Sequence, residues 1–223
     1  MRNITAVEVS PQDTAAIERL AQLAGQIWHQ HFPQIIGEAQ TSYMVGLFQS
    51  FEAIRAQLAS GYRYFFLMEK PEDGSQPATI TPGATNNAAD PAGDTDAGLP
   101  SPATGELAIT QDECRLSAAS DISRLPLLGY FGIQLRTDTD ELHLSKLYVS
   151  LESRGTGAGS FAIQTCRELA RAAGLSRVTL TCNKYNTNTL AFYKQRGFTI
   201  TDDVVTDIGN GYVMDDYIME LAV

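Results

Sequence analysis

Residues 153–160, SRGTGAGS, place three glycines between two regularly patterned segments. Residues 141–149 (ELHLSKLYV) alternate apolar and polar side chains like a β-strand. Residues 157–173 carry apolar side chains at helical spacing and predict one buried stripe, formed by Ala162, Cys166, Leu169 and Ala173. A glycine-rich turn from a strand into a helix leaves the first helical N–H groups without partners, and the helix dipole favours an anion there. We therefore predict an α/β fold with a candidate anion site where a strand meets a helix.

The remainder of the chain also alternates between strand and helix patterns, with no internal repeat. One α/β domain over residues 1–223, built on a mixed sheet, accounts for this order. We expect strands at 4–10, 62–70, 177–182, 198–206 and 212–223, two more strands within 126–150, and helices at 11–32, 37–49, 51–60, 157–173 and 186–197.

Residues 73–122 differ in composition from the rest of the chain. They are rich in Ala, Thr, Pro, Gly, Asn and Asp, and no aromatic residue occurs between Pro71 and Leu125. Such a stretch buries too little apolar surface to offset the entropy of ordering it. We expect a flexible insertion between the second and third strands, with a short strand at 105–110 as one alternative.

Charge and composition exclude several classes of protein. The net charge of −10 argues against a nucleic-acid partner, but nine of the 26 acidic residues lie within 71–125, so the acidity says little about a substrate. No apolar run reaches the roughly 20 residues that span a bilayer, and the N-terminal residues lack a secretory pattern. Three cysteines without a CxxC pair indicate reduced thiols in a cytoplasmic protein, and no metal site is expected. These cysteines are Cys114, Cys166 and Cys182.

Two phosphate-binding motifs fit the glycine loop poorly. A P-loop requires a lysine before its final Ser or Thr, and none is present here. A dinucleotide fingerprint requires a glycine where Ser160 stands, and the strand that follows ends at Asn183 without an acid for a ribose. A structural turn that binds nothing is a further alternative.

A third pattern, [Q/R]xxGx[G/A], is satisfied in full by residues 154–159. It resembles the pyrophosphate loop of the GNAT (Gcn5-related) N-acetyltransferases. A second signature of that family is matched by Asn186, Tyr193 and the pair Gly197-Phe198. The resemblance is strong over 127–223, and it implies a mostly antiparallel sheet of about seven strands, with helices on both faces and a splayed fourth strand.

The resemblance implies that acetyl-CoA donates acetyl directly to an amine. Its pyrophosphate would lie on the loop, its pantetheine arm would pair with the backbone of the central strand, and Asn186 would hydrogen-bond the arm from the other side. The residues expected to bind acetyl-CoA are Leu147, Tyr148, Val149, Arg154, Gly155, Thr156, Gly157, Ala158, Gly159, Ser160, Asn186 and Tyr193.

Tyr193 is the expected general acid, since a phenol is able to protonate a leaving thiolate; the alternative is a core aromatic residue. Glu141 and His143 are candidates for the general base, and a water relay from backbone carbonyls is another route. We expect Cys166 and Cys182 to be structural, because the attacking nitrogen belongs to the substrate.

The acceptor site is expected on the first helices and the last strand. The best subfamily match is a small bacterial branch similar to polyamine acetyltransferases, which favours a small, cationic primary amine and is compatible with a homodimer. Acetylation of a protein N-terminus or lysine, and a non-catalytic acyl-CoA-binding module, are the alternatives. The candidate acceptor residues are Trp28, His31, Tyr43 and Asp215, with Glu38, Gln40, Met44 and Asp216 nearby.

Overall fold

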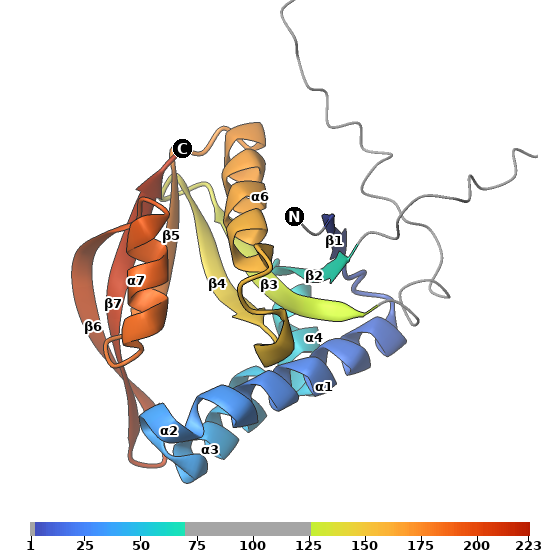
Figure 1. Cartoon of the computed structure of the whole chain (residues 1–223), viewed down its shortest axis with the longest axis vertical. Coiled ribbons are helices and arrows are strands. Elements are labelled where there is room, and N and C mark those ends of the chain that lie inside the picture. Colours follow the sequence, from blue (N-terminus) through green and yellow to red (C-terminus); the bar gives the residue numbers. More distant parts are fainter. Residues whose placement is uncertain (1–2, 70–125) are drawn as a thin grey trace, which may run out of the picture.

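A computed structural model describes residues 3–69 and 126–223. The insertion expected over 73–122, the short strand at 105–110 and Cys114 lie outside these residues. The described part forms a seven-stranded sheet in the order β1-β2-β3-β4-β5-β7-β6, in which only β4 and β5 are parallel (Figure 1). The strands are β1 (Ile4–Glu8), β2 (Arg63–Glu69), β3 (Leu127–Arg136), β4 (Glu141–Val149), β5 (Arg177–Asn183), β6 (Thr199–Gly209) and β7 (Tyr212–Ala222).

Helices cover both faces of the sheet, as the sequence predicted. On one face α6 packs against β3, β4 and β5, with α7 beside it, while α1 and α4 cover the other face (Figure 1). The Asp13 side chain caps α1 by accepting a hydrogen bond from the backbone N–H of Ala16 at 3.0 Å. The helices are α1 (Thr14–His31), α2 (Pro33–Ile36), α3 (Glu38–Phe48), α4 (Phe51–Ala59), α6 (Ala158–Ala172) and α7 (Thr187–Gln195).

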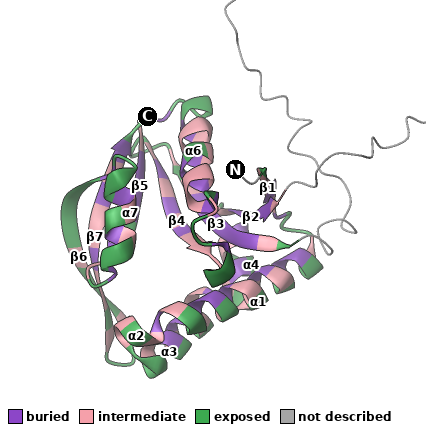
Figure 2. Cartoon of the chain, viewed as in Figure 1, coloured by how far each residue is buried: buried purple, intermediate pink, exposed green. Residues whose placement is uncertain are grey.

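Apolar side chains form a separate core on each side of the sheet (Figure 2). The stripe expected on α6 is partly wrong. Ala162 and Cys166 are buried, but Leu169 is only half-buried and Ala173 is exposed beyond the end of the helix. The helix instead buries the face that contains Ala158, Ile163 and Ala170, because this face lies over β4.

The centre of the sheet opens between β4 and β5. Their pairing covers only three residues of each strand and stops at His143, opposite Thr179. Just beyond that point, Leu144 pairs with Ile133 and Lys146 with Gly132, so Ser145 is an extra residue in β4. Such a bulge bends a strand and reverses the alternation of its side chains. The splayed central strand is therefore confirmed.

The β6–β7 hairpin reaches α3 at the open end of the sheet (Figure 1). Its turn contains Asn210 and Gly211 with φ of 55° and 76°, the left-handed conformation that a tight hairpin requires. The Tyr43 hydroxyl donates to the carbonyl oxygen of Ile208 at 2.6 Å, and the Gln40 amide donates to that of Val213 at 2.8 Å. These two bonds join α3 to β6 and β7 at the open end of the sheet.

Candidate active site

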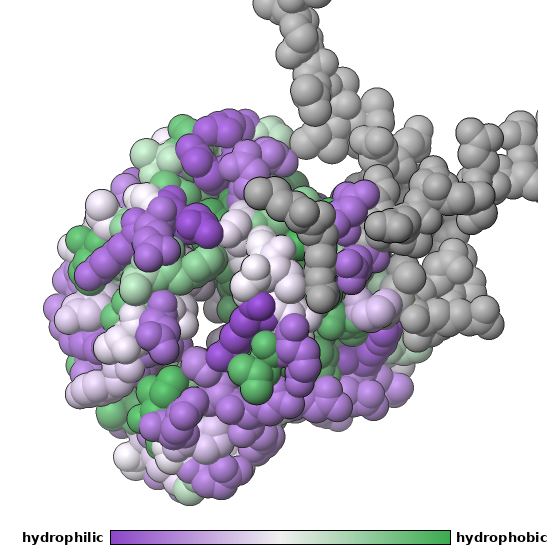
Figure 3. All heavy atoms as spheres, in the orientation of Figure 1, coloured by the Kyte–Doolittle hydropathy of each residue, from purple (hydrophilic) through white to green (hydrophobic). Residues whose placement is uncertain are grey.

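A cavity of about 700 Å³ lies where β4 and β5 separate. The loop before α6 and the first turns of α6 and α7 line one end, while α1, α3 and α4 line the other. Figure 3 shows an opening in the middle of this face of the molecule. Residues from both halves of the chain therefore meet around one space.

The loop end of the cavity is built to receive an anion. The backbone N–H groups of Gly155 and of residues 157–160 have no acceptor within the described part of the chain. Gly155 and Gly157 have φ of 77° and 96°, where a side chain would strain the backbone, and Gly157 precedes the first residue of α6. The amides and the helix dipole together make a site suited to a phosphate.

Two arginines accompany these amides. Arg154 lines the cavity at the loop. Arg196, which sequence reasoning missed, follows α7 and donates from Nε and Nη2 to the Ser160 hydroxyl at 3.0 and 2.7 Å. The Thr156 hydroxyl instead donates to the carbonyl of Ser153 at 2.7 Å, and Thr156 does not line the cavity. Its contribution is to close the turn.

The central strand β4 presents different side chains to the two ends of the cavity. Leu147 and Val149 pack with the core under α6, and the backbone beyond His143 is no longer paired with β5. The Tyr148 side chain points the other way and packs on Trp28, with ring centroids 5.5 Å apart. The side chain of Tyr148 therefore belongs to the wall at the α1 end, unlike its neighbours.

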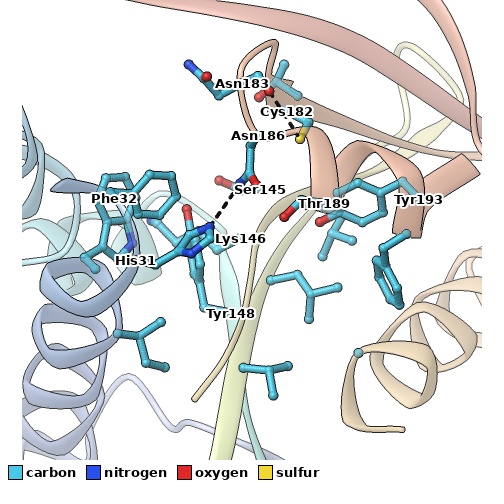
Figure 4. Close-up of a pocket in the computed structure, with 18 of the residues that line it drawn as sticks. His31, Phe32, Ser145, Lys146, Tyr148, Cys182, Asn183, Asn186, Thr189 and Tyr193 are labelled. Carbon is cyan, nitrogen blue, oxygen red and sulfur yellow. Dashed lines mark hydrogen bonds between the residues drawn. The ribbon is translucent and has the colours of Figure 1, made fainter. Parts of the chain in front are cut away.

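Tyr193 lines the cavity from α7, beside Thr189 (Figure 4). Burial raises the pKa of its phenol well above the ordinary value, and the neighbouring Cys182, Tyr148 and Cys166 raise it further. The hydroxyl therefore retains its proton at neutral pH and is available as a donor inside the cavity.

The two candidate bases on β4 lie in different places. Glu141 is at the start of the strand, outside the cavity lining, and forms ion pairs with Arg136 at 3.0 Å and Arg177 at 3.6 Å. His143 lines the cavity, and its Nδ1 lies 3.3 Å from the Thr179 hydroxyl. Burial lowers the pKa of His143 to about 4, so its imidazole is neutral but weakly basic.

His31 and Asn186 connect the two ends of the cavity. The Asn186 amide nitrogen lies 3.3 Å from His31 Nε2 (Figure 4). Burial, followed by the nearby Arg154, lowers the pKa of His31. Asn186 thus contacts α1, while Trp28 and Phe32 stack beside it with ring centroids 4.2 Å apart.

The two adjacent acidic residues of β7 lie in different environments. Asp215 pairs with Lys184 at 2.6 Å and does not line the cavity, whereas Asp216 lines it and is 9% exposed. Burial, then Asp215, raises the pKa of Asp216 to about 6. Tyr43 and Glu38 also lie outside the lining: Tyr43 bonds to Ile208, and Glu38 contacts His29.

Lys146 is a cavity residue that sequence reasoning did not single out. It is 7% exposed, and its ammonium lies 5.0 Å from the centre of the Tyr64 ring. Burial lowers the pKa of Lys146 to about 7. The only signal in the sequence was the polar pair Ser145-Lys146 within an otherwise alternating strand.

Comparison with known proteins agrees with this geometry. Residues 90–198 match the model of the acetyltransferase (GNAT) family; of these, 90–125 lie outside the described part. A segment of the chain therefore matches a GNAT acetyltransferase domain. The matched range contains the glycine loop, Asn186, Tyr193 and the pair Gly197-Phe198, so the resemblance expected from those motifs is confirmed. GNAT enzymes use acetyl-CoA as donor.

Solved structures share the GNAT fold over nearly the whole chain. The PaiA N-acetyltransferase of Thermoplasma acidophilum, solved with coenzyme A, is 15% identical with a TM-score of 0.60, covering 99% of both chains. A Gcn5-related N-acetyltransferase of Rhodopseudomonas palustris is 14% identical, with a TM-score of 0.61 and coverage of 100% and 98%. The spermidine N-acetyltransferase of Vibrio cholerae, solved with CoA and spermine, is 11% identical, with a TM-score of 0.54 and coverage of 99% and 95%.

Other comparisons add little. Among curated proteins, none matches the sequence significantly. None of the helices within residues 3–69 and 126–223 is both long and apolar enough to cross a membrane.

Proposed function

We propose that this GNAT domain transfers acetyl from acetyl-CoA to a primary amine of a small molecule. The proposal depends most on one observation: the unpartnered amides before α6 and the Tyr193 side chain line the same cavity. A phosphate-bearing donor and a proton donor are thereby brought to one space, with room left beyond Tyr193 for a second substrate.

The donor would lie along α6 and β4. Its pyrophosphate would accept hydrogen bonds from the amides of Gly155 and of residues 157–160, with Arg154 and Arg196 neutralising its charge. Its amide-containing arm would pair with the unpaired backbone at Leu147 and Val149, as an added strand does. In this arrangement the thioester would lie beside Tyr193.

Acetyl-CoA supplies an activated acetyl group, and the side chains around it donate and accept the protons of the reaction. The amine nitrogen forms a bond to the acetyl carbon while the carbon–sulfur bond breaks and sulfur leaves with the electron pair. Tyr193 donates a proton to that sulfur, and the backbone N–H of Val149 stabilises charge on the thioester oxygen. The proton that the nitrogen loses as the amide forms restores Tyr193.

The acceptor arrives as an ammonium and must lose one further proton before it attacks. Asp216 is the base that best fits the cavity, because it lies in the lining and its pKa of about 6 keeps it ionised at neutral pH. His143 has a pKa of about 4 and is a weaker base, and Glu141 lies away from the lining. The proton taken by Asp216 is released to solvent.

A small acceptor fits the far end of the cavity better than a folded protein does. The bonds from Tyr43 to Ile208 and from Gln40 to Val213 bridge α3 and the β6–β7 hairpin across this end. The Trp28 and Phe32 rings form an aromatic wall beside it. A peptide chain would have to separate these contacts to enter.

Release of free CoA, measured across a panel of small amines and a set of protein substrates, tests the proposal. We expect turnover with small amines and a loss of rate in Tyr193→Phe. Leu190→Met, a volume-conserving change at a buried position on the same helix, is the control for folding. Turnover only with proteins would contradict the acceptor class, and acetyl-CoA binding without turnover would indicate a binding module.

A further inference from the structure

We propose that the acceptor amine carries a carboxylate, and that the Lys146 ammonium binds this carboxylate at the α4 end of the cavity. The inference rests on the proposed function and names the chemical class of its acceptor. It predicts amino acids as acceptors in preference to amines that bear only positive charge.

The bulge at Ser145 places Lys146 on the acceptor side of the sheet. With regular alternation, the side chain of Lys146 would lie on the same face of β4 as that of Leu144. The extra residue Ser145 shifts the pairing, so Lys146 lies opposite Gly132 and its side chain shares a face with Tyr148. Gly132 has no side chain, and a Cβ there would lie 2.9 Å from the Tyr64 ring. The Tyr64 ring therefore lies across this strand position and meets Lys146.

The hydrogen bonds of Lys146 leave one donor unused. Its Nζ donates to the Tyr64 hydroxyl and to Gln57 Oε1, and the same Gln57 oxygen accepts from Tyr64. An ammonium has three N–H groups, so the third has no acceptor within residues 3–69 and 126–223. Gln57 and Tyr64 hold Nζ in place, and a ligand oxygen would complete its bonding.

The cluster also lacks a negative charge. No Asp or Glu in the described part of the chain lies within ion-pair distance of Lys146. Tyr64, Tyr130 and Tyr148 are neutral phenols, since burial raises the pKa of each. A buried cation is unfavourable without a counter-ion. A substrate carboxylate would supply that counter-ion, and one free N–H suits a carboxylate oxygen.

The cavity joins this cation to the donor site. Lys146, Gln57 and Tyr62 line it together with Asp216 and Tyr193. An acceptor with an amine and a carboxylate matches this pair of opposite charges, because Asp216 receives the ammonium and Lys146 the carboxylate. A polyamine would satisfy Asp216 but would bring a like charge toward Lys146.

Pairs of substrates that differ only in the carboxylate test its contribution to recognition. The common L-amino acids and their carboxamides differ at one group, so kcat/KM for each acid and its amide measures the preference for charge. We expect at least one acid to exceed its amide by about tenfold or more, the range for a hydrogen bond between charged groups. In Lys146→Met this ratio should fall toward one. Lys194→Met, the same change at an exposed site on α7, should keep the wild-type ratio.

Calorimetry in the presence of CoA supplies a measurement that does not need turnover. The preferred amino acid should bind the wild type more tightly than its amide does, and Lys146→Met should lose this difference while binding acetyl-CoA as before. Amides that bind and react as well as the acids would overturn the inference. A loss of rate in Lys146→Met that is equal for acids and amides would also overturn it, because it would make Lys146 a base. Failure of acetyl-CoA itself to bind would instead refute the proposed function.

Discussion

Replacing Lys146 by Met should make the protein more stable at neutral pH. Burial lowers the pKa of Lys146 from 10.5 to about 7. Since each pH unit corresponds to about 1.4 kcal/mol, this burial costs on the order of 4 kcal/mol of folding free energy near pH 7. Methionine keeps the apolar stem but loses two hydrogen bonds of about 1 kcal/mol each. The expected net gain in the free energy of unfolding is about 2 kcal/mol.

The difference in the free energy of unfolding between the wild type and Lys146→Met should depend on pH. Between about pH 7 and 10.5 the unfolded chain keeps the proton on Lys146 while the folded chain has released it. The wild type should therefore gain about 1.4 kcal/mol of stability per pH unit as the pH rises through this window, relative to Lys146→Met. The advantage of the variant is then greatest at and below about pH 7, disappears between about pH 8 and 9, and is reversed at higher pH.

Urea denaturation at about pH 7, 8 and 9, with Lys194→Met as the exposed control, measures both quantities. The control should follow the wild type at every pH. Parallel curves for the wild type and Lys146→Met, or a variant less stable at pH 7, would refute the view that burial without a counter-ion lowers the pKa of Lys146.

Further substitutions test the other parts of the site. Tyr193→Phe should lower kcat by about 10²-fold or more when chemistry limits the rate, and an unchanged kcat would exclude proton donation by this phenol. The kcat/KM of the wild type should fall below about pH 6 as the Asp216 carboxylate becomes protonated, and Asp216→Asn should remove this fall; a fall that persists in the variant would exclude Asp216 as the base. Gly157→Ala should weaken acetyl-CoA binding in calorimetry through strain at φ 96°, whereas Gly46→Ala, within α3 and with open space around it, should not; equal affinities would contradict the loop site. Arg196→Gln should weaken the same binding and make it less sensitive to salt, and an unchanged Kd would remove Arg196 from the phosphate site.

Apart from Arg196, the sequence predicted the residues that meet at the loop end of the cavity. The glycine loop and the spacing to Asn186 and Tyr193 are local patterns, and the structure brings their residues together around one cavity. The position of Glu141 also followed from the sequence in principle. It begins a strand whose far end carries the loop, and at about 3.3 Å per residue the two are roughly 26 Å apart.

The acceptor half depends on register, which the sequence does not show. Strict alternation would place Lys146 on the same face as Leu144, but the extra residue at Ser145 reverses it. In β7, the choice between Asp215 and Asp216 is decided by pairing with β5, which sets Asp216 opposite Asn183. In both strands, pairing with a strand distant in the sequence decides which side chain faces the cavity. Local sequence patterns therefore could not predict Lys146 or choose between Asp215 and Asp216.

Mass spectrometry of the products formed from acetyl-CoA and a mixture of amino acids and polyamines tests the central claim most directly. We expect an N-acetylated small amine, formed by the wild type at a rate far above that of Tyr193→Phe. Detection of acetylated protein alone, or equal product with both enzymes, would contradict acetyl transfer to a small amine with Tyr193 as proton donor.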